Sequence, residues 1–135
     1  MVQIAGKYQL VENKNFYEFI LKAGVPKDVA KERNEERPIL KISVDGNKIN
    51  LETSGKMKNL LNLVLNEETE ETLGPQSLFT YKNFAKLEGN VLIVESKKPD
   101  GSRGRKRIYT FSDNGLEMEW VSERFGTAKH IYKRI

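Results

Sequence analysis

The feature that most constrains this chain is a long series of short segments in which apolar and polar residues alternate. Residues 39–44 and 49–53 follow this pattern, and Asp45-Gly46-Asn47 separates them. Alternation with a period of two is typical of strands with one buried face, and Asp, Gly and Asn favour the turn of a hairpin. Further candidate strands lie at residues 78–87, 91–96, 105–111, 116–122 and 127–135, and at residues 59–65, which are Leu-rich on both sides and therefore ambiguous by period. Between two of these segments, residues 67–71 form a run of charge.

One strand and two short helices are expected before this series. Residues 6–12 alternate as a strand, and Asn15 is a good N-cap for a first helix, with Glu18 three residues later as in a capping box. Gly24 is placed to end this helix as a C′ glycine. Pro26 then begins a second helix that extends to about residue 36 and is unusually polar, so we expect it to be held loosely.

A meander of about ten strands must hide its two edges, and closure into a barrel does so. The width of a barrel grows with strand number, and about ten strands enclose more space than their own side chains fill. The 135 residues suffice for one domain, residues 1–135, with the two helices at about residues 15–36. The pattern therefore predicts a barrel with an internal ligand cavity.

Composition narrows the class of protein further. The chain is 38% hydrophobic and 31% charged, as expected for a soluble globular protein, and no apolar run approaches the ~18 residues of a membrane span. The start of the chain lacks the layout of a signal peptide, and the absence of cysteine weakly favours a reducing compartment, so we expect a cytoplasmic protein. One histidine and no cysteine offer too few ligands for a metal site, and no cofactor is indicated.

The last segment carries the best candidate for a polar anchor. In a strand, Ala128, His130 and Tyr132 share one face, whereas Lys129 and Ile131 lie on the other. If the first face lines a cavity, the only histidine of the chain and a tyrosine meet the ligand there.

Several motifs in order resemble the intracellular lipid-binding proteins, the family of fatty-acid-binding and retinoid-binding proteins. Gly6-Lys7-Tyr8-Gln9-Leu10 is similar to the opening Gly-x-Trp/Tyr-x-Leu of the family, and Asn15-Phe16-Tyr17-Glu18-Phe19 to its first helix. Lys56-Met57-Lys58-Asn59 resembles its Thr-Phe-Lys-Asn, and Glu67-Glu68-Thr69-Glu70-Glu71 its Glu-Glu-Phe-Glu-Glu. His130-Ile131-Tyr132 resembles the Arg-x-Tyr of its closing strand. The likeness runs nearly the whole length of the chain.

The resemblance implies an all-β fold, a ten-stranded antiparallel up-and-down β-barrel shaped like a clam, with a two-helix lid. It also implies a monomeric carrier of a long-chain fatty acid or similar hydrophobic ligand, with no catalysis. The ligand carboxylate would be gripped by the Arg-x-Tyr pair, whose arginine is replaced here by His130. A histidine is charged only when protonated, so a bulkier, less acidic or hydroxylated ligand is also indicated.

The implied head-group residues are His130, Tyr132, Arg107 and Tyr109. Tyr109 aligns with a second inward arginine of many members, and Arg107 lies two residues earlier on the same strand face. For His130 and Tyr132, the alternative is an interior pair that meets only ordered water. For Arg107, it is a solvated basic strand, because Arg105, Lys106 and Arg107 are consecutive.

The implied cavity wall and portal comprise mainly apolar residues. The lid would contribute one face of its helices, and the barrel would contribute its inward residues. Met57 would take the place of a portal phenylalanine of the family. Met118 and Trp120 would narrow the cavity. For the lid residues the alternative is a helix face packed on the barrel, for Met57 a loop tip, and for Trp120 an ordinary core tryptophan. The set is Phe16, Phe19, Ile20, Val25, Val29, Leu40, Leu51, Met57, Met118 and Trp120.

The charge pattern leaves further partners open. The net charge is +4, and Lys22, Lys27, Lys31 and Arg33 on the lid permit transient contact with an anionic membrane, although neighbouring acidic residues also favour a plain solvated face. A rival hypothesis is a small basic β-barrel that binds nucleic acid or a protein partner. Nucleic acid is not expected, because basic and acidic residues are interleaved throughout. An enzyme is the weakest hypothesis, since no nucleophile–base spacing and no glycine-rich phosphate loop is present.

Overall fold

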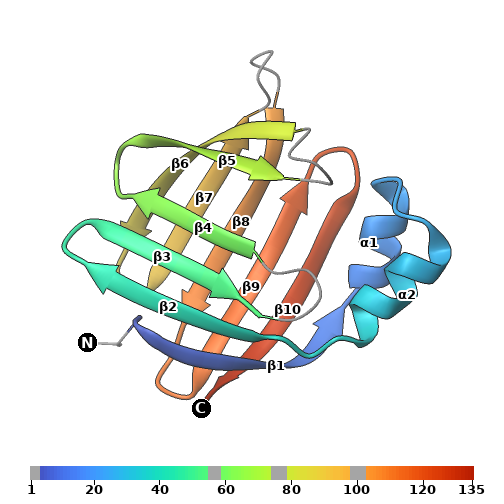
Figure 1. The fold of residues 1–135 in the computed structure, drawn as a ribbon, viewed down its shortest axis with the longest axis horizontal. Helices are drawn as coiled ribbons and strands as arrows, with labels where there is room; N and C mark the ends of the chain where they lie inside the picture. The colour runs from blue at the N-terminus through green and yellow to red at the C-terminus, as the bar shows by residue number, and fades with distance from the viewer. Residues whose placement is uncertain (1–3, 55–58, 74–78, 98–102) are drawn as a thin grey trace.

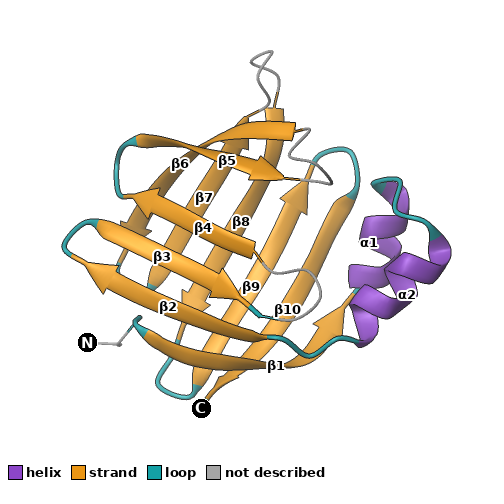
Figure 2. Ribbon diagram, in the orientation of Figure 1, coloured by secondary structure: helices purple, strands orange, loops and turns teal. Residues whose placement is uncertain are grey.

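The computed structural model describes residues 4–54, 59–73, 79–97 and 103–135. Its strands form one ten-stranded sheet in the hydrogen-bonded order β4-β3-β2-β1-β10-β9-β8-β7-β6-β5. All the pairings in this sheet are antiparallel, and the sheet curls into a barrel (Figures 1 and 2). The predicted ten-stranded up-and-down barrel with a two-helix lid is therefore confirmed.

The elements follow the predicted order. The strands are β1 (Gly6–Lys14), β2 (Ile39–Asp45), β3 (Lys48–Thr53), β4 (Asn59–Val64), β5 (Glu68–Leu73), β6 (Phe79–Glu88), β7 (Val91–Lys97), β8 (Arg103–Phe111), β9 (Gly115–Ser122) and β10 (Gly126–Arg134). The helices are α1 (Phe16–Lys22) and α2 (Lys27–Glu35).

Closure rests on the first and last strands. β1 pairs with β10 on one side and with β2 on the other, which joins the two ends of the meander. Among the described residues no ladder joins β4 to β5, although the two strands are in contact and a single bridge links Leu65 to Ala85. The barrel is therefore nearly closed, with one seam between β4 and β5.

The run of charge is part of this seam, because residues 68–73 form β5 rather than a loop. Glu68 and Glu70 are exposed and Thr69 is half-buried between them, so one face of the strand turns inward despite its polarity. Pairing of Thr69 with Asn83 of β6 holds the strand in the sheet. Hydrophobic alternation did not reveal this strand, since its inward position carries a threonine.

The two helices cover one end of the barrel, where α1 lies against β10 and α2 lies against α1 (Figure 1). Gly24, with a φ of 98°, ends α1 as predicted, and the hydrogen bonds from the Gly24 and Val25 amides to Leu21 and Ile20 form a Schellman motif. The predicted capping box is wrong. Asn15 has a φ of 59°, and its side chain donates to the Thr127 carbonyl at 2.7 Å, so it ties the start of α1 to β10 instead of capping the helix.

The core has two parts. Inward side chains of the strands form the larger part, which includes Tyr8, Ile49, Leu63, Leu92 and Phe111, all fully buried. A smaller cluster lies between the lid and the barrel and comprises Phe19, Ile20, Ala30 and Ala128. Of the nine residues of α2, all of them described, Ala30 alone is buried, which agrees with the polarity of this helix.

Candidate functional site

The register of the last three strands brings the predicted head-group residues together. His130 of β10 lies opposite Met118 of β9, which lies opposite Tyr109 of β8. In the next inward row, Trp120 of β9 lies opposite Arg107 of β8. Because directly opposed residues in antiparallel strands present their side chains to the same face, both rows point into the barrel.

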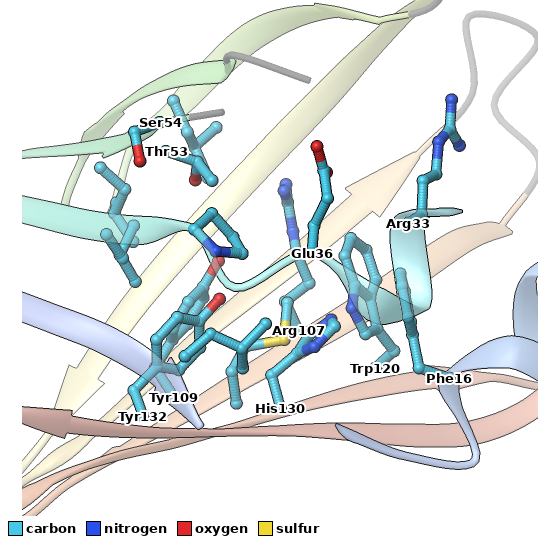
Figure 3. Close-up of a pocket in the computed structure, with 16 residues that line it drawn as sticks. Phe16, Arg33, Glu36, Thr53, Ser54, Arg107, Tyr109, Trp120, His130 and Tyr132 are labelled. Carbon is cyan, nitrogen blue, oxygen red and sulfur yellow. The ribbon is translucent and has the colours of Figure 1, made fainter. Parts of the chain in front are cut away.

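These rows form one wall of an internal cavity of about 230 Å³. In Figure 3, Tyr109 and Tyr132 lie at one side of this cavity, Phe16 and Trp120 at the other, and Arg107 and His130 between them. The volume lies below the ~300–1,000 Å³ typical of ligand pockets, and Met118 and Trp120 both line it. The lining comprises Leu10, Phe16, Arg33, Glu36, Pro38, Leu40, Leu51, Thr53, Ser54, Leu61, Arg107, Tyr109, Met118, Trp120, His130 and Tyr132.

Nine of the residues named from the sequence therefore line the cavity: His130, Tyr132, Arg107, Tyr109, Phe16, Leu40, Leu51, Met118 and Trp120. Four lid residues do not. Phe19 and Ile20 are buried between α1 and the barrel, and Val25 packs against the same cluster, whereas Val29 is only half-buried. For Phe19 and Ile20 the cause is the orientation of α1, whose apolar face packs onto Ala128 and Trp120. Met57 and the expected turn at Gly74-Pro75 lie outside the described residues.

Sequence reasoning missed seven lining residues. Leu10 belongs to an inward row of β1 and follows the same alternation as Leu40 and Leu51, so that alternation could have revealed it. Leu61 lies in β4, whose sequence has leucines on both faces, so alternation does not show which of them turns inward. The others lie where a strand or helix ends, and residues at such ends carry no periodic signal: Arg33, Glu36, Pro38, Thr53 and Ser54.

Arg107 gives the cavity a buried permanent charge. Its side chain is 5% exposed, and its guanidinium lies 5.6 Å from the centre of the Trp120 ring. Arg105, on the same face of β8, contacts the same ring at 5.2 Å and the Tyr81 ring at 5.4 Å, but it is more exposed and does not line the cavity. Stacking on aromatic rings offsets part of the cost of burying these cations.

His130 and Tyr132 are held neutral. Burial, with a smaller contribution from the charge of Arg37, lowers the pKa of His130 to about 4. Burial, with Tyr109 nearby, raises the pKa of the Tyr132 hydroxyl above its usual range. At neutral pH the cavity therefore presents an uncharged imidazole and an uncharged phenol beside the guanidinium of Arg107.

Trp120 carries an unsatisfied donor. Its indole Nε1 is buried and has no hydrogen-bond partner among the described residues. Its ring lies 6.2 Å from Phe19, so it separates the lid cluster from the cavity. Since Trp120 is the only tryptophan of the chain, its emission reports on this position alone.

Fold and cavity together define a β-barrel protein with an internal, largely apolar cavity. No family model matches the chain. A fatty acid-binding protein of Tyrophagus putrescentiae is 27% identical over 135 residues, an alignment that covers 99% of each chain. The solved structure of the REP1-NXSQ fatty acid transporter is 25% identical with a TM-score of 0.83, covering 98% of this chain and 96% of that one. Human cRBP IV shares the fold over the full length of both chains, with a TM-score of 0.86 at 17% identity.

Over its whole length, in sequence and in fold, the chain is similar to members of the intracellular lipid-binding protein family. Members of this family are binding proteins and not enzymes, as the sequence led us to expect. In the part of the chain that the structure describes, no helix has the length and apolar character needed to cross a membrane.

Proposed function

We propose that this protein carries a long-chain fatty acid or a similar amphipathic ligand through the cytoplasm, with the whole chain acting as one monomeric binding domain. The observation that carries the proposal is the combination of an apolar wall with a buried guanidinium in one cavity. Leu10, Leu40, Leu51 and Leu61 would desolvate the ligand chain, at about 25 cal/mol per Å² of apolar surface removed from water.

The acidic head would bind at Arg107, with the hydroxyls of Tyr109 and Tyr132 as further partners. A carboxylate that meets a buried guanidinium makes a charge-assisted hydrogen bond, which is stronger than a neutral one. The cavity is narrow, so a long chain would displace a flexible lining residue such as Met118 or leave its end near the lid. The likeness to a fatty acid-binding protein and a fatty acid transporter supports this choice of ligand.

The test is to identify lipid in organic extracts of gently purified protein by mass spectrometry, and then to titrate the delipidated protein with stearate while following Trp120 emission. We expect about one equivalent of lipid and a shift of emission on re-addition. Arg107→Gln should weaken stearate binding about tenfold or more, because a hydrogen bond to a charged group contributes ~1.5–3 kcal/mol. Lys106→Gln changes the charge equally on the outer face of β8 and should leave the affinity unchanged within about twofold.

The carrier function would be refuted if the purified protein contained no lipid and its Trp120 emission did not change on addition of stearate. Equal weakening by both substitutions would show that net charge, and not the position of Arg107, governs binding.

We also propose that the lid touches anionic membranes transiently during delivery. Lys22, Lys27 and Lys31 are exposed on α1 and α2, and each basic residue near such a surface contributes ~1 kcal/mol. Exposed acidic residues on α2 reduce this attraction and keep the contact brief. Transfer of ligand to vesicles that contain phosphatidylserine should be faster than transfer to neutral vesicles, and the difference should shrink in high salt.

A further inference from the structure

A bulge in β1 determines which side chain faces His130. Leu10 lies opposite Tyr132, but the next pairs are Glu12 with Ile131 and Asn13 with His130, so Val11 is an extra residue in β1. Strict alternation after Leu10 would turn Glu12 inward and Asn13 outward. The extra residue reverses this arrangement, because one inserted residue moves every following side chain to the opposite face. Glu12 is consequently exposed, and Asn13 faces His130.

The amide of Asn13 is oriented by the end of α2. Its Nδ2 donates to the carbonyl oxygen of Asn34 at 2.9 Å. Asn34 lies in the last turn of α2, where backbone carbonyls have no partner within the helix. A carbonyl can only accept, so Nδ2 must face Asn34 and Oδ1 must face the other way.

This orientation determines the tautomer of His130. Oδ1 of Asn13 lies 2.6 Å from Nδ1 of His130, and an amide oxygen only accepts, so Nδ1 carries the proton. The imidazole is neutral, since burial lowers its pKa to about 4. Its Nε2 therefore presents a lone pair, and this atom has no hydrogen-bond partner among the described residues. The ring of Phe16 packs edge-on against the imidazole, with 4.4 Å between the ring centroids, and limits its rotation.

We propose that Asn13 is a positioning residue that holds His130 as a hydrogen-bond acceptor in the cavity, and that the protein thereby prefers ligands with a hydroxyl group on the apolar chain. The inference rests on the proposed carrier function and specifies its ligand further. A hydroxyl can donate to Nε2, whereas a methylene leaves that lone pair without a partner. A carboxylate would meet the lone pair unfavourably, so the acidic head belongs at Arg107.

The positioning role is tested by NMR of the imidazole nitrogens. The chain has one histidine, so the spectrum contains one pair of signals. At pH 7 we expect a protonated Nδ1 and an unprotonated Nε2. Asn13→Leu removes the acceptor and should shift the ring toward the tautomer protonated at Nε2. Asn15→Gly is the matched control, because it deletes another asparagine bond to β10 without touching His130 and suits the positive φ of that position. It should leave the tautomer unchanged.

The ligand preference is tested with stearate and a panel of stearates that carry one hydroxyl at different chain positions. One additional hydrogen bond should favour at least one hydroxystearate over stearate by roughly three- to tenfold in the wild-type chain. Asn13→Leu should reduce this ratio to about one, and Asn15→Gly should preserve it.

Equal binding of stearate and every hydroxystearate would overturn this inference and leave the proposed function intact. The inference also fails if Nε2 carries the proton in the wild-type chain, or if the preference persists in Asn13→Leu. If neither stearate nor any hydroxystearate binds, the proposed function fails and this inference fails with it.

Discussion

Replacing His130 with glutamine removes the only histidine of the chain and isolates its effect on acid stability. The pKa of His130 is about 4 in the folded protein, whereas a histidine free of such interactions, as in the unfolded chain, has a pKa of 6.5. Between these values the unfolded chain binds a proton at His130 and the folded chain does not. The free energy of unfolding must therefore fall as the pH falls from about 6.5 to about 4.

The size of this effect follows from the shift. Each pKa unit corresponds to ~1.4 kcal/mol, so the wild-type chain should lose about 2 kcal/mol by pH 5 and about 3 kcal/mol by pH 4 through this residue. His130 is 8% exposed, so solvent screening reduces the effect little. Glutamine does not titrate and loses nothing by this route.

The assay is urea unfolding of both chains at pH 7.5, 6, 5 and 4.5. Protonation of carboxylates affects both chains alike and cancels in the difference between them. We expect His130→Gln to be less stable than the wild-type chain at pH 7.5, because it loses the hydrogen bond to Asn13. As the pH falls, the difference in free energy of unfolding should shift steadily in favour of His130→Gln. Parallel pH profiles, with a constant difference, would refute the assignment of His130 as a buried neutral group.

Three further outcomes are expected. Because His130 stays neutral, the stearate affinity of the delipidated protein should change less than about twofold between pH 8 and 5.5, and marked strengthening in acid would show that the imidazole acquires charge. Gly115→Ala should destabilise the protein by ~2 kcal/mol or more in denaturant unfolding, since a Cβ there collides with the Tyr132 carbonyl and lies 3.0 Å from Cα of Lys133, and a variant of wild-type stability would contradict this close approach. In hydrogen exchange, amides of α2 should exchange faster than those of β9 and β10, because α2 buries one residue, and equal protection would refute the loosely held lid.

The barrel was predictable because its signals are repeated. Inward residues such as Leu40 and Leu51 are a local consequence of period-two alternation, and a meander of about ten strands leaves closure as the way to hide its edges. β5 escaped this reasoning because its inward Thr69 is polar. The capping box at Asn15 failed for another reason: the asparagine forms a tertiary hydrogen bond to β10, and no local pattern encodes a partner 112 residues away.

The candidate site was predictable only in part. The face shared by His130 and Tyr132 follows from alternation along one strand. The role inferred for Asn13 does not, because strict alternation in β1 places Glu12, and not Asn13, on the inner face. Only the observed pairing of β1 with β10 reveals the bulge at Val11. A bulge depends on the register of two strands from opposite ends of the chain, so the sequence of one strand cannot show it.

Arg107 and Asn13 should act independently if the two proposals describe different parts of one ligand. They lie on β8 and β1, three strands apart, which corresponds to roughly 14 Å at the usual strand spacing. Substitutions at this separation without a shared partner usually add within ~0.5 kcal/mol. For the preferred hydroxystearate, the loss of binding free energy in Arg107→Gln/Asn13→Leu should therefore equal the sum of the two single losses. A coupling above ~1 kcal/mol, measured by the same emission titration, would mean that both residues act on one ligand group. In that case the head group would lie beside His130 as well as Arg107, and the assignment of the carboxylate to Arg107 and of the hydroxyl to His130 would be wrong.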